Sequence, residues 1–95
     1  MYAVIVGCGH TGRHLASALI EVGHEVLVVE KDPARAEWVS QDLGAVVTVG
    51  DGSDPEVLRA AGVARAEVLI AATNRDEDNL AACLMAKALF NVPKN

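Results

Sequence analysis

Aromatic residues and cysteines are scarce in this sequence. One Phe, one Trp and one Tyr make up 3% of its 95 residues, so a hydrophobic core has to come from Val, Leu, Ile and Ala. The two cysteines, Cys8 and Cys83, stand far apart and have neither CxxC spacing nor the density of a disulfide framework. The chain starts on a strand-like run where a secreted protein would carry a charged leader. We therefore expect a reducing, cytoplasmic location.

Long apolar runs and basic clusters are missing as well. The longest stretch without Asp, Glu, Lys or Arg runs from Met1 to Gly12, well short of the roughly 20 residues that a membrane-spanning helix needs. The 8 basic residues are scattered and outnumbered by 13 acidic ones, which gives a net charge of −5 and argues against nucleic-acid binding. With 52% hydrophobic and 22% charged residues, the chain is not disordered. We expect one soluble domain that does not insert into a membrane.

Short Val- and Ile-rich runs alternate with longer segments of helical spacing, and Gly, Asp or Pro marks each boundary. This alternation is typical of a parallel sheet with crossover helices. Strands are predicted at residues 2–6, 25–30, 45–49 and 67–72, and helices at 11–22, 33–43, 55–61 and 75–90. Right-handed crossovers then give a Rossmann-like, three-layer α/β fold with strand order 3-2-1-4 and helices on both faces of the sheet.

Three helix starts carry capping signals. Asp32 and Asp54 each precede a proline, a combination that predicts an N-cap followed by the first helical residue. Asn74 and Glu77 are predicted to form a capping pair for the last helix.

A glycine-rich loop joins the first predicted strand to the first helix. Residues 7–12, GCGHTG, fit the pattern G-x-G-x-x-G, and Glu30 ends the next strand 18 residues after Gly12. In this context the pattern predicts a nucleotide-binding loop. Gly7 allows a tight turn, Gly9 lets the backbone approach a pyrophosphate and Gly12 lets the helix pack closely, while the first amides of the helix bind phosphate. The alternative is that the glycines only shape a turn.

Polar residues at the other strand ends extend this prediction. Glu30 is placed to accept hydrogen bonds from ribose hydroxyls and to repel a 2′-phosphate, which favours NAD or an adenine nucleotide over NADP; Lys31 next to it weakens that exclusion. Asp51 is a candidate for the adenine amino group, and Thr73 and Asn74 are candidates for ribose or phosphate oxygens. The alternatives are a solvated strand end for Glu30, loop positions for Asp51 and Thr73, and a helix cap for Asn74. The predicted nucleotide-binding residues are Gly7, Cys8, Gly9, His10, Thr11, Gly12, Glu30, Lys31, Asp51, Gly52, Ala72, Thr73 and Asn74.

Apart from the glycine-rich loop, the sequence shows no recognisable motif of catalytic or metal-binding residues. We find no Tyr-x-x-x-Lys and no paired His and carboxylate placed to face a nicotinamide, so we expect no enzymatic activity. His10 and His14 have the spacing of a metal-binding pair but lack a further ligand, and we expect no metal site. Cys8 is either a reactive thiol at a helix start or, as we favour, a small side chain in a crowded turn. An oxidoreductase fragment and a structural oligomerisation module with an empty site are the alternative functions.

Several motifs together resemble one known family. They are the glycine loop, VVEKD at 28–32, GDGSDPEVL at 50–58, AGV and AEVLIAAT within 61–73, and DEDN at 76–79. This combination spans essentially the whole chain and is similar to the Trk/Ktr-type potassium-transport nucleotide-binding domain, also called the RCK N-terminal or KTN domain.

The resemblance implies a function as well as a Rossmann fold. Domains of this family bind NAD(H) or ATP, ADP or AMP, and regulate potassium channels and transporters as dimers or larger rings. By resemblance, residues 7–12 hold the phosphates, Glu30 the ribose, Asp51 and Gly52 the adenine, and Thr73 lines the far side of the cleft. The chain is then expected in the cytoplasm, at the inner face of the membrane through a transporter subunit.

The sequence departs from the family at one loop position and in length. Position 10 is His where the family often has Arg. The single domain, residues 1–95, lacks the C-terminal part that completes the cleft in the family, so we expect an adenosine-binding half without a nicotinamide half. The fourth strand is then expected to be an uncovered edge, which favours a homodimer.

Overall fold

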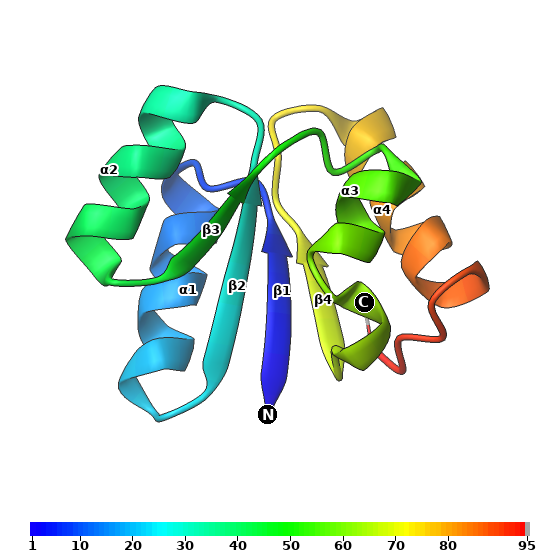
Figure 1. The fold of residues 1–95 in the computed structure, drawn as a ribbon, viewed down its shortest axis with the longest axis horizontal. Helices are drawn as coiled ribbons and strands as arrows, with labels where there is room; N and C mark the ends of the chain where they lie inside the picture. The colour runs from blue at the N-terminus through cyan, green and yellow to red at the C-terminus, as the bar shows by residue number, and fades with distance from the viewer. Residues whose placement is uncertain (95) are drawn as a thin grey trace.

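The computed structural model describes residues 1–94 as a parallel sheet between two layers of helices (Figure 1). The sheet order is β3-β2-β1-β4, which confirms the predicted topology. Its strands are β1 (Tyr2–Val6), β2 (Glu25–Glu30), β3 (Val46–Val49) and β4 (Val68–Ala71). The helices are α1 (His10–Glu21), α2 (Pro33–Leu43), α3 (Pro55–Ala60), the 3₁₀ turn η1 (Val63–Arg65) and α4 (Asp76–Ala88).

Each face of the sheet has its own hydrophobic layer because neighbouring residues of a strand point to opposite faces. Val4 and Val6 of β1 pack in the cluster that includes residues of α3 and α4. Ile5, between them, packs in the cluster that includes residues of α1 and α2. The continuous run 26–29 of β2 contributes to both layers, as expected of a strand that is covered on both faces.

The two Asp-Pro helix starts are confirmed. Asp32 Oδ1 accepts a hydrogen bond from the Ala34 amide at 3.0 Å, and Asp54 Oδ1 accepts one from the Glu56 amide at 2.9 Å. Each aspartate therefore satisfies one amide that the first turn of its helix leaves free.

The predicted capping pair of the last helix is wrong. The N-cap of α4 is Arg75, which makes no capping hydrogen bond through its side chain, and Asn74 lies one residue outside the helix start. Asp76, Glu77 and Asp78 occupy the first turn instead. Their negative charges stabilise the positive end of the helix without a cap.

The edge of β4 is partly covered, contrary to the expectation of an open edge. The Leu69 amide donates a hydrogen bond to the Lys94 carbonyl oxygen at 2.9 Å, and Val68 forms a parallel bridge with Lys94. Phe90 and Val92 are buried in the hydrophobic cluster that also contains residues of α3 and α4. Their burial holds the segment after α4 against the sheet. Asn91, which lies between these two residues, has a φ of 57°.

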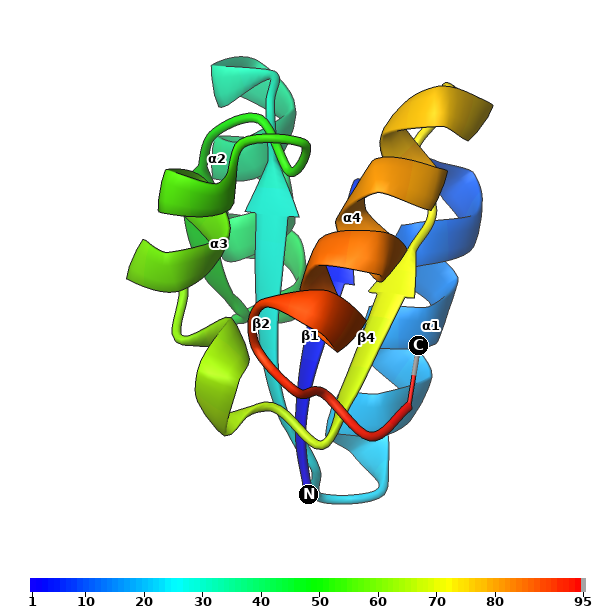
Figure 2. The ribbon, with the colours of Figure 1, turned by 90° about the vertical axis from the view of Figure 1, so that its right-hand side faces the viewer.

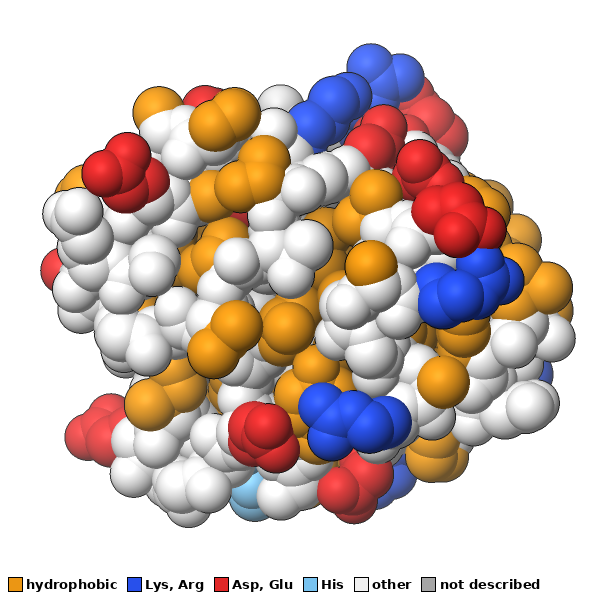
Figure 3. All heavy atoms as spheres, viewed as in Figure 1, with side chains coloured by type: hydrophobic (Ala, Val, Ile, Leu, Met, Phe, Trp, Pro, Cys, Tyr) orange, Lys and Arg blue, Asp and Glu red, His pale blue; other side chains and the backbone are white. Residues whose placement is uncertain are grey.

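In Figure 3 acidic and basic side chains are interspersed over the visible face. Within residues 1–94, no helix combines the length and the hydrophobicity that a membrane span requires.

The short helix α3 depends on one buried side chain, Leu58, which is fully buried in the cluster between α3 and α4. We expect Leu58→Ala to lower the free energy of unfolding by about 2–5 kcal/mol, because the lost contacts leave a cavity. Leu89→Ala is the matched control, since Leu89 is 58% exposed and its truncation should change stability by less than about 0.5 kcal/mol. Urea denaturation measures both; equal losses would contradict the assigned core.

Candidate functional site

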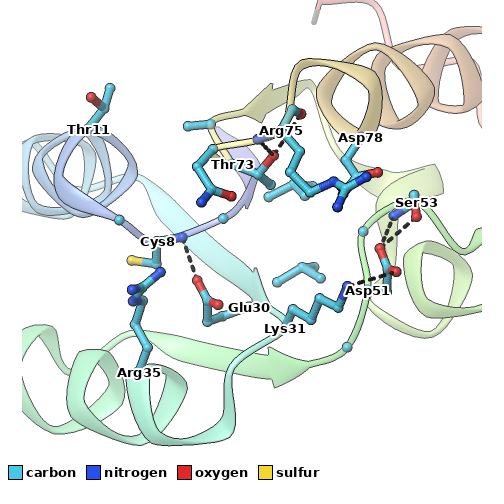
Figure 4. A pocket seen from close by; sticks show the side chains of 18 of the residues that line it. Cys8, Thr11, Glu30, Lys31, Arg35, Asp51, Ser53, Thr73, Arg75 and Asp78 are labelled. Carbon is cyan, nitrogen blue, oxygen red and sulfur yellow. Dashed lines mark hydrogen bonds and ion pairs between the residues drawn. The ribbon is translucent and has the colours of Figure 1, made fainter.

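The carboxyl ends of the strands surround a cavity of about 460 Å³ (Figure 4). The cavity opens where the strand order reverses, between β1 and β4, which is the usual ligand position in open α/β sheets. Its volume suits a small-molecule ligand. Every predicted nucleotide-binding residue except Gly12 lines it. The lining residues that sequence reasoning missed are Val6, Val29, Arg35, Gly50, Ser53, Arg75 and Asp78.

The three glycines of the loop have different environments. Gly7 has a φ of +91°, and a Cβ there would lie 2.8 Å from Thr73 Cγ2. A Cβ at Gly12 would lie 2.2 Å from the Gly7 carbonyl oxygen, so α1 can start only if this residue has no side chain. A Cβ at Gly9 would meet nothing within 4 Å. The packing of the loop therefore requires glycine at positions 7 and 12. Gly9 is not required for packing and leaves the loop open toward the cavity.

Helix α1 begins without a cap or an acidic residue, unlike α2, α3 and α4. Its N-cap, Gly9, has no side chain, and its first turn carries no carboxylate. The first intrahelical hydrogen bond runs from the Arg13 amide to the Gly9 carbonyl oxygen at 3.0 Å, so the amides of residues 10–12 have no acceptor within the helix. This helix end therefore presents free donors and partial positive charge, a combination that suits an anion.

Glu30 is the single charged side chain that is buried among the described residues, with 4% exposure. Its Oε1 accepts a hydrogen bond from the Cys8 amide at 2.8 Å, and its Oε2 accepts one from the Asp32 amide at 2.9 Å. The alternative of a solvated strand end is therefore wrong. The carboxylate ties the glycine loop to the start of α2 and still lines the cavity (Figure 4), and it keeps acceptor capacity for further donors.

The Cys8 thiol is buried in the loop with 3% exposure. Burial raises the pKa of Cys8, and the nearby Glu30 carboxylate raises it further. The thiol is therefore protonated at neutral pH, and a reactive thiolate is not supported. The favoured interpretation, a small side chain in a crowded turn, agrees with this geometry.

Asp51 and Lys31 lie at the mouth of the cavity (Figure 4). Asp51 Oδ1 accepts hydrogen bonds from the Ser53 amide at 2.9 Å and the Ser53 hydroxyl at 2.6 Å, and these bonds, with the Lys31 ammonium 3.7 Å from Oδ2, lower the pKa of Asp51. The adjacent Gly52 packs on β1, since a Cβ there would lie 2.2 Å from Val6 Cγ1. Asp51 is thus an ionised acceptor whose position is set by the turn that it caps.

Asn79 is a structural residue that sequence reasoning missed. Its Oδ1 accepts hydrogen bonds from the Thr73 amide at 2.9 Å and the Thr73 hydroxyl at 2.6 Å, and its Nδ2 donates one to the Thr73 carbonyl oxygen at 3.1 Å. Thr73 in turn abuts Gly7. One amide side chain from α4 therefore holds the wall of the cavity against the glycine loop, and the Thr73 hydroxyl donates a hydrogen bond to Asn79.

Charged residues at the rim complete the site. Arg75 pairs with Glu77 Oε1 at 2.8 Å and with Asp78 Oδ2 at 3.4 Å, and its side chain is 60% exposed. Arg35 reaches the cavity from the first turn of α2. Both follow a strand end in the sequence, and this position is the signal that could have identified them.

His10 and His14 have ring centroids 4.5 Å apart, but residues 1–94 contain no cluster of three or more metal-ligating side chains.

The chain matches a protein family over nearly its whole length. The family model of the TrkA-N domain matches residues 3–95. A Trk system potassium uptake protein TrkA homolog from Methanothermobacter thermautotrophicus is 37% identical over 94 residues, which cover 99% of this chain and 43% of that protein. The chain therefore spans less than half the length of this relative.

Solved structures of similar fold include two that hold a bound nucleotide. A structure described as the GsuK channel bound to NAD has a TM-score of 0.84 and 29% sequence identity, over 98% of this chain and 17% of that one. The Kef CTD of Shewanella denitrificans in AMP-bound form has a TM-score of 0.82 and 22% identity, over 99% of this chain and 57% of that one. At this identity the second likeness concerns the fold alone.

The glycine loop is tested by two alanine substitutions. Gly12→Ala should destabilise the protein by about 1–3 kcal/mol or more, because the new Cβ collides with the backbone of Gly7. Gly9→Ala has open space and a φ of −73° that alanine adopts freely, so its effect on stability should stay within about 0.5 kcal/mol. Thermal denaturation compares the two; a Gly9→Ala variant as unstable as Gly12→Ala would refute the assignment.

The hydrogen bonds between the Asn79 side chain and Thr73, which we call the brace, are tested by substitutions of Asn79. Asn79→Ala should cost about 1–3 kcal/mol, because the polar atoms of Thr73 lose their partners in a partly buried place. Asn79→Asp keeps the acceptor but loses the donor to the Thr73 carbonyl oxygen, so it should fall between the wild type and Asn79→Ala. Gln41→Ala, which removes an exposed amide on α2, is the control. Chemical denaturation that ranks Asn79→Ala with Gln41→Ala would count against the brace.

Proposed function

The chain belongs to the TrkA-N domain family, and we propose that it is a regulatory domain that binds NAD(H) or an adenine nucleotide for a potassium channel or transporter. The observation that carries this proposal is the cavity at the strand ends, which places the free amides of α1 beside the buried Glu30 carboxylate. The free amides can donate hydrogen bonds to phosphate oxygens, and the carboxylate can accept hydrogen bonds from ribose hydroxyls. The GsuK channel of similar fold is bound to NAD, which contains both groups.

The cavity suggests one ligand orientation. The phosphates lie at the amides of residues 10–12, the ribose hydroxyls donate to Glu30, and the adenine lies toward Asp51 and Gly52. Thr73 and Ala72 form the opposite wall. His10, where the resembling family often has Arg, contributes its amide to the phosphate site, and its ring adds a positive charge only when it is protonated.

A sensing role is favoured over catalysis by the state of the polar groups. Glu30 is committed to two backbone amides, Asp51 to Ser53 and Lys31, and the Cys8 thiol is protonated. These interactions stabilise the site but supply no free base or nucleophile. We propose that the domain acts in the cytoplasm, as a homodimer or larger assembly, on a potassium-transporting membrane subunit.

Ligand-dependent thermal stability tests this function. NAD, NADH, AMP, ADP and ATP should each be titrated against the purified chain, and at least one should raise Tm progressively with concentration, because ligands that bind only the folded state stabilise it. Adenine alone and inorganic phosphate alone serve as fragment controls and should act more weakly. The absence of any shift at millimolar nucleotide would favour a structural module with an empty site. Substrate-dependent oxidation of NADH would instead support an oxidoreductase.

The role of Glu30 is tested through a ratio of affinities, because Glu30 also holds the loop and its loss can weaken every ligand. The wild type should bind NAD more tightly than NADP, since the carboxylate repels a 2′-phosphate. Glu30→Gln should reduce this preference by about tenfold. Lys31→Ala should increase it, because the ammonium that compensates the repulsion is gone.

The control for Glu30 lies on the same strand. Glu25→Gln changes the opposite, exposed end of β2 and should leave both affinities and their ratio unchanged. Isothermal titration calorimetry gives the dissociation constants of NAD and NADP for the wild type and the three variants. An unchanged NAD-to-NADP ratio in both Glu30→Gln and Lys31→Ala would show that Glu30 does not face the ribose.

A further inference from the structure

Charged side chains border the end of the cavity that lies away from the start of α1. They are Lys31, Asp51, Arg75 and Asp78 (Figure 4). The Arg75 side chain points from the segment after β4 toward the side of the cavity where Lys31 and Asp51 lie. Figure 2 shows that α4 starts at the same end of the molecule as the arrowheads of β2 and β4. Arg75, which directly precedes α4, is thereby brought to the cavity.

The Arg75 guanidinium is held at two of its edges. Its Nη2 donates a hydrogen bond to Glu77 Oε1 at 2.8 Å, and its Nε lies 3.4 Å from Asp78 Oδ2. The Arg75 amide also donates to the Thr73 hydroxyl at 3.2 Å, which ties the backbone to the β4 wall. The N–H groups of a guanidinium lie in its plane, so both ion pairs leave its flat faces available. The side chain keeps 60% exposure.

The two carboxylates decide what kind of group Arg75 can bind. Together they compensate the charge of the guanidinium, and Asp76 adds a third carboxylate in the same helical turn. A phosphate at this point would be repelled by the carboxylates. A neutral aromatic ring would not be, and guanidinium groups stack favourably on such rings. Arg75 is therefore suited to the base of a nucleotide and not to its phosphates.

A planar contact at this end of the cavity has to come from a residue other than an aromatic one. The described residues that line the cavity include no Phe, Trp or Tyr, and His10 belongs to the start of α1. Figure 4 places the second lining arginine, Arg35, beside Cys8 at the glycine loop. The Arg75 guanidinium can supply the flat surface that aromatic side chains supply in many base-binding sites.

We propose that the Arg75 guanidinium stacks on the nucleobase of the bound nucleotide, opposite the wall formed by Asp51 and Gly52. This inference rests on the proposed function and adds the group that covers the base. Glu77 and Asp78 are positioning residues, because they hold the guanidinium before the ligand arrives and so reduce the entropy that binding costs. A contact with the face of the ring accepts any purine, and the choice of adenine stays with the acceptor Asp51.

The substitution Arg75→Lys separates stacking from charge. Lysine keeps the positive charge between the carboxylates but has no planar group. Each of AMP, ADP, ATP and NAD that binds the wild type should bind this variant about tenfold more weakly. The factor should be similar for all of them, because they carry the same base. Isothermal titration calorimetry on the intact chain measures the affinities.

Arg59→Lys is the matched control. Arg59 has a similar side-chain exposure of 59%, pairs with Glu56 on α3 and does not line the cavity. The affinities of this variant should stay within about twofold of the wild type. Circular dichroism confirms that both variants are folded.

Ribose 5-phosphate, which lacks the base, tests the contact from the side of the ligand. In competition with AMP it should bind the wild type and Arg75→Lys equally within about twofold, because neither protein can stack on it. An Arg75→Lys variant that binds AMP like the wild type, or that loses affinity for AMP and ribose 5-phosphate alike, would overturn the stacking contact and leave the nucleotide site in place. A loss that grows from AMP to ATP would assign Arg75 to the phosphates instead. A wild type that binds no nucleotide would remove the proposed function and this inference together.

Discussion

The buried Glu30 carboxylate is the interaction on which the geometry of the cavity depends. It joins the glycine loop to the start of α2 by accepting one backbone amide from each. A carboxylate at 4% exposure is tolerable because both oxygens are hydrogen-bonded, which offsets the cost of desolvation. The group proposed to recognise ribose is therefore also the group that shapes the loop. Binding and local structure cannot be separated at this position except by comparing ligands.

Close backbone contacts fix the remainder of the cavity. Thr73 rests against Gly7, and the Gly7 carbonyl oxygen in turn lies where a Cβ of residue 12 would be. This series of contacts leaves no space for a side chain at either glycine, so the segment after β4 and the start of α1 pack directly on the glycine loop. Asn79 completes the series from α4. Helix α4 thus supports the cavity through its inner side.

Local sequence patterns predicted much of this structure. The strand order, the two Asp-Pro helix starts and most of the residues that line the cavity follow from signals within a few positions of one another, because parallel strands bring their carboxyl ends to one edge. Two of the contacts that these patterns missed join residues that are not neighbours in the sequence. Asn79 bonds to a loop that precedes its helix, and the carbonyl of Lys94 reaches the edge of β4. Nothing near these residues in the sequence indicates the partner.

The sequence by itself determined the fold class and the position of the glycine-rich loop, since both rest on short-range spacing of glycines, aspartates and β-branched residues. The family followed from the resemblance of several motifs along the whole chain. Only the tertiary structure decided that Glu30 is buried between two amides and that burial raises the pKa of Cys8. The same holds for the Thr73 hydroxyl, which points to Asn79. The physical reason is that burial and hydrogen-bond partners depend on which segments meet in space. The same type of residue can bind a ligand, cap a helix or hold two segments together, depending on the residues that surround it.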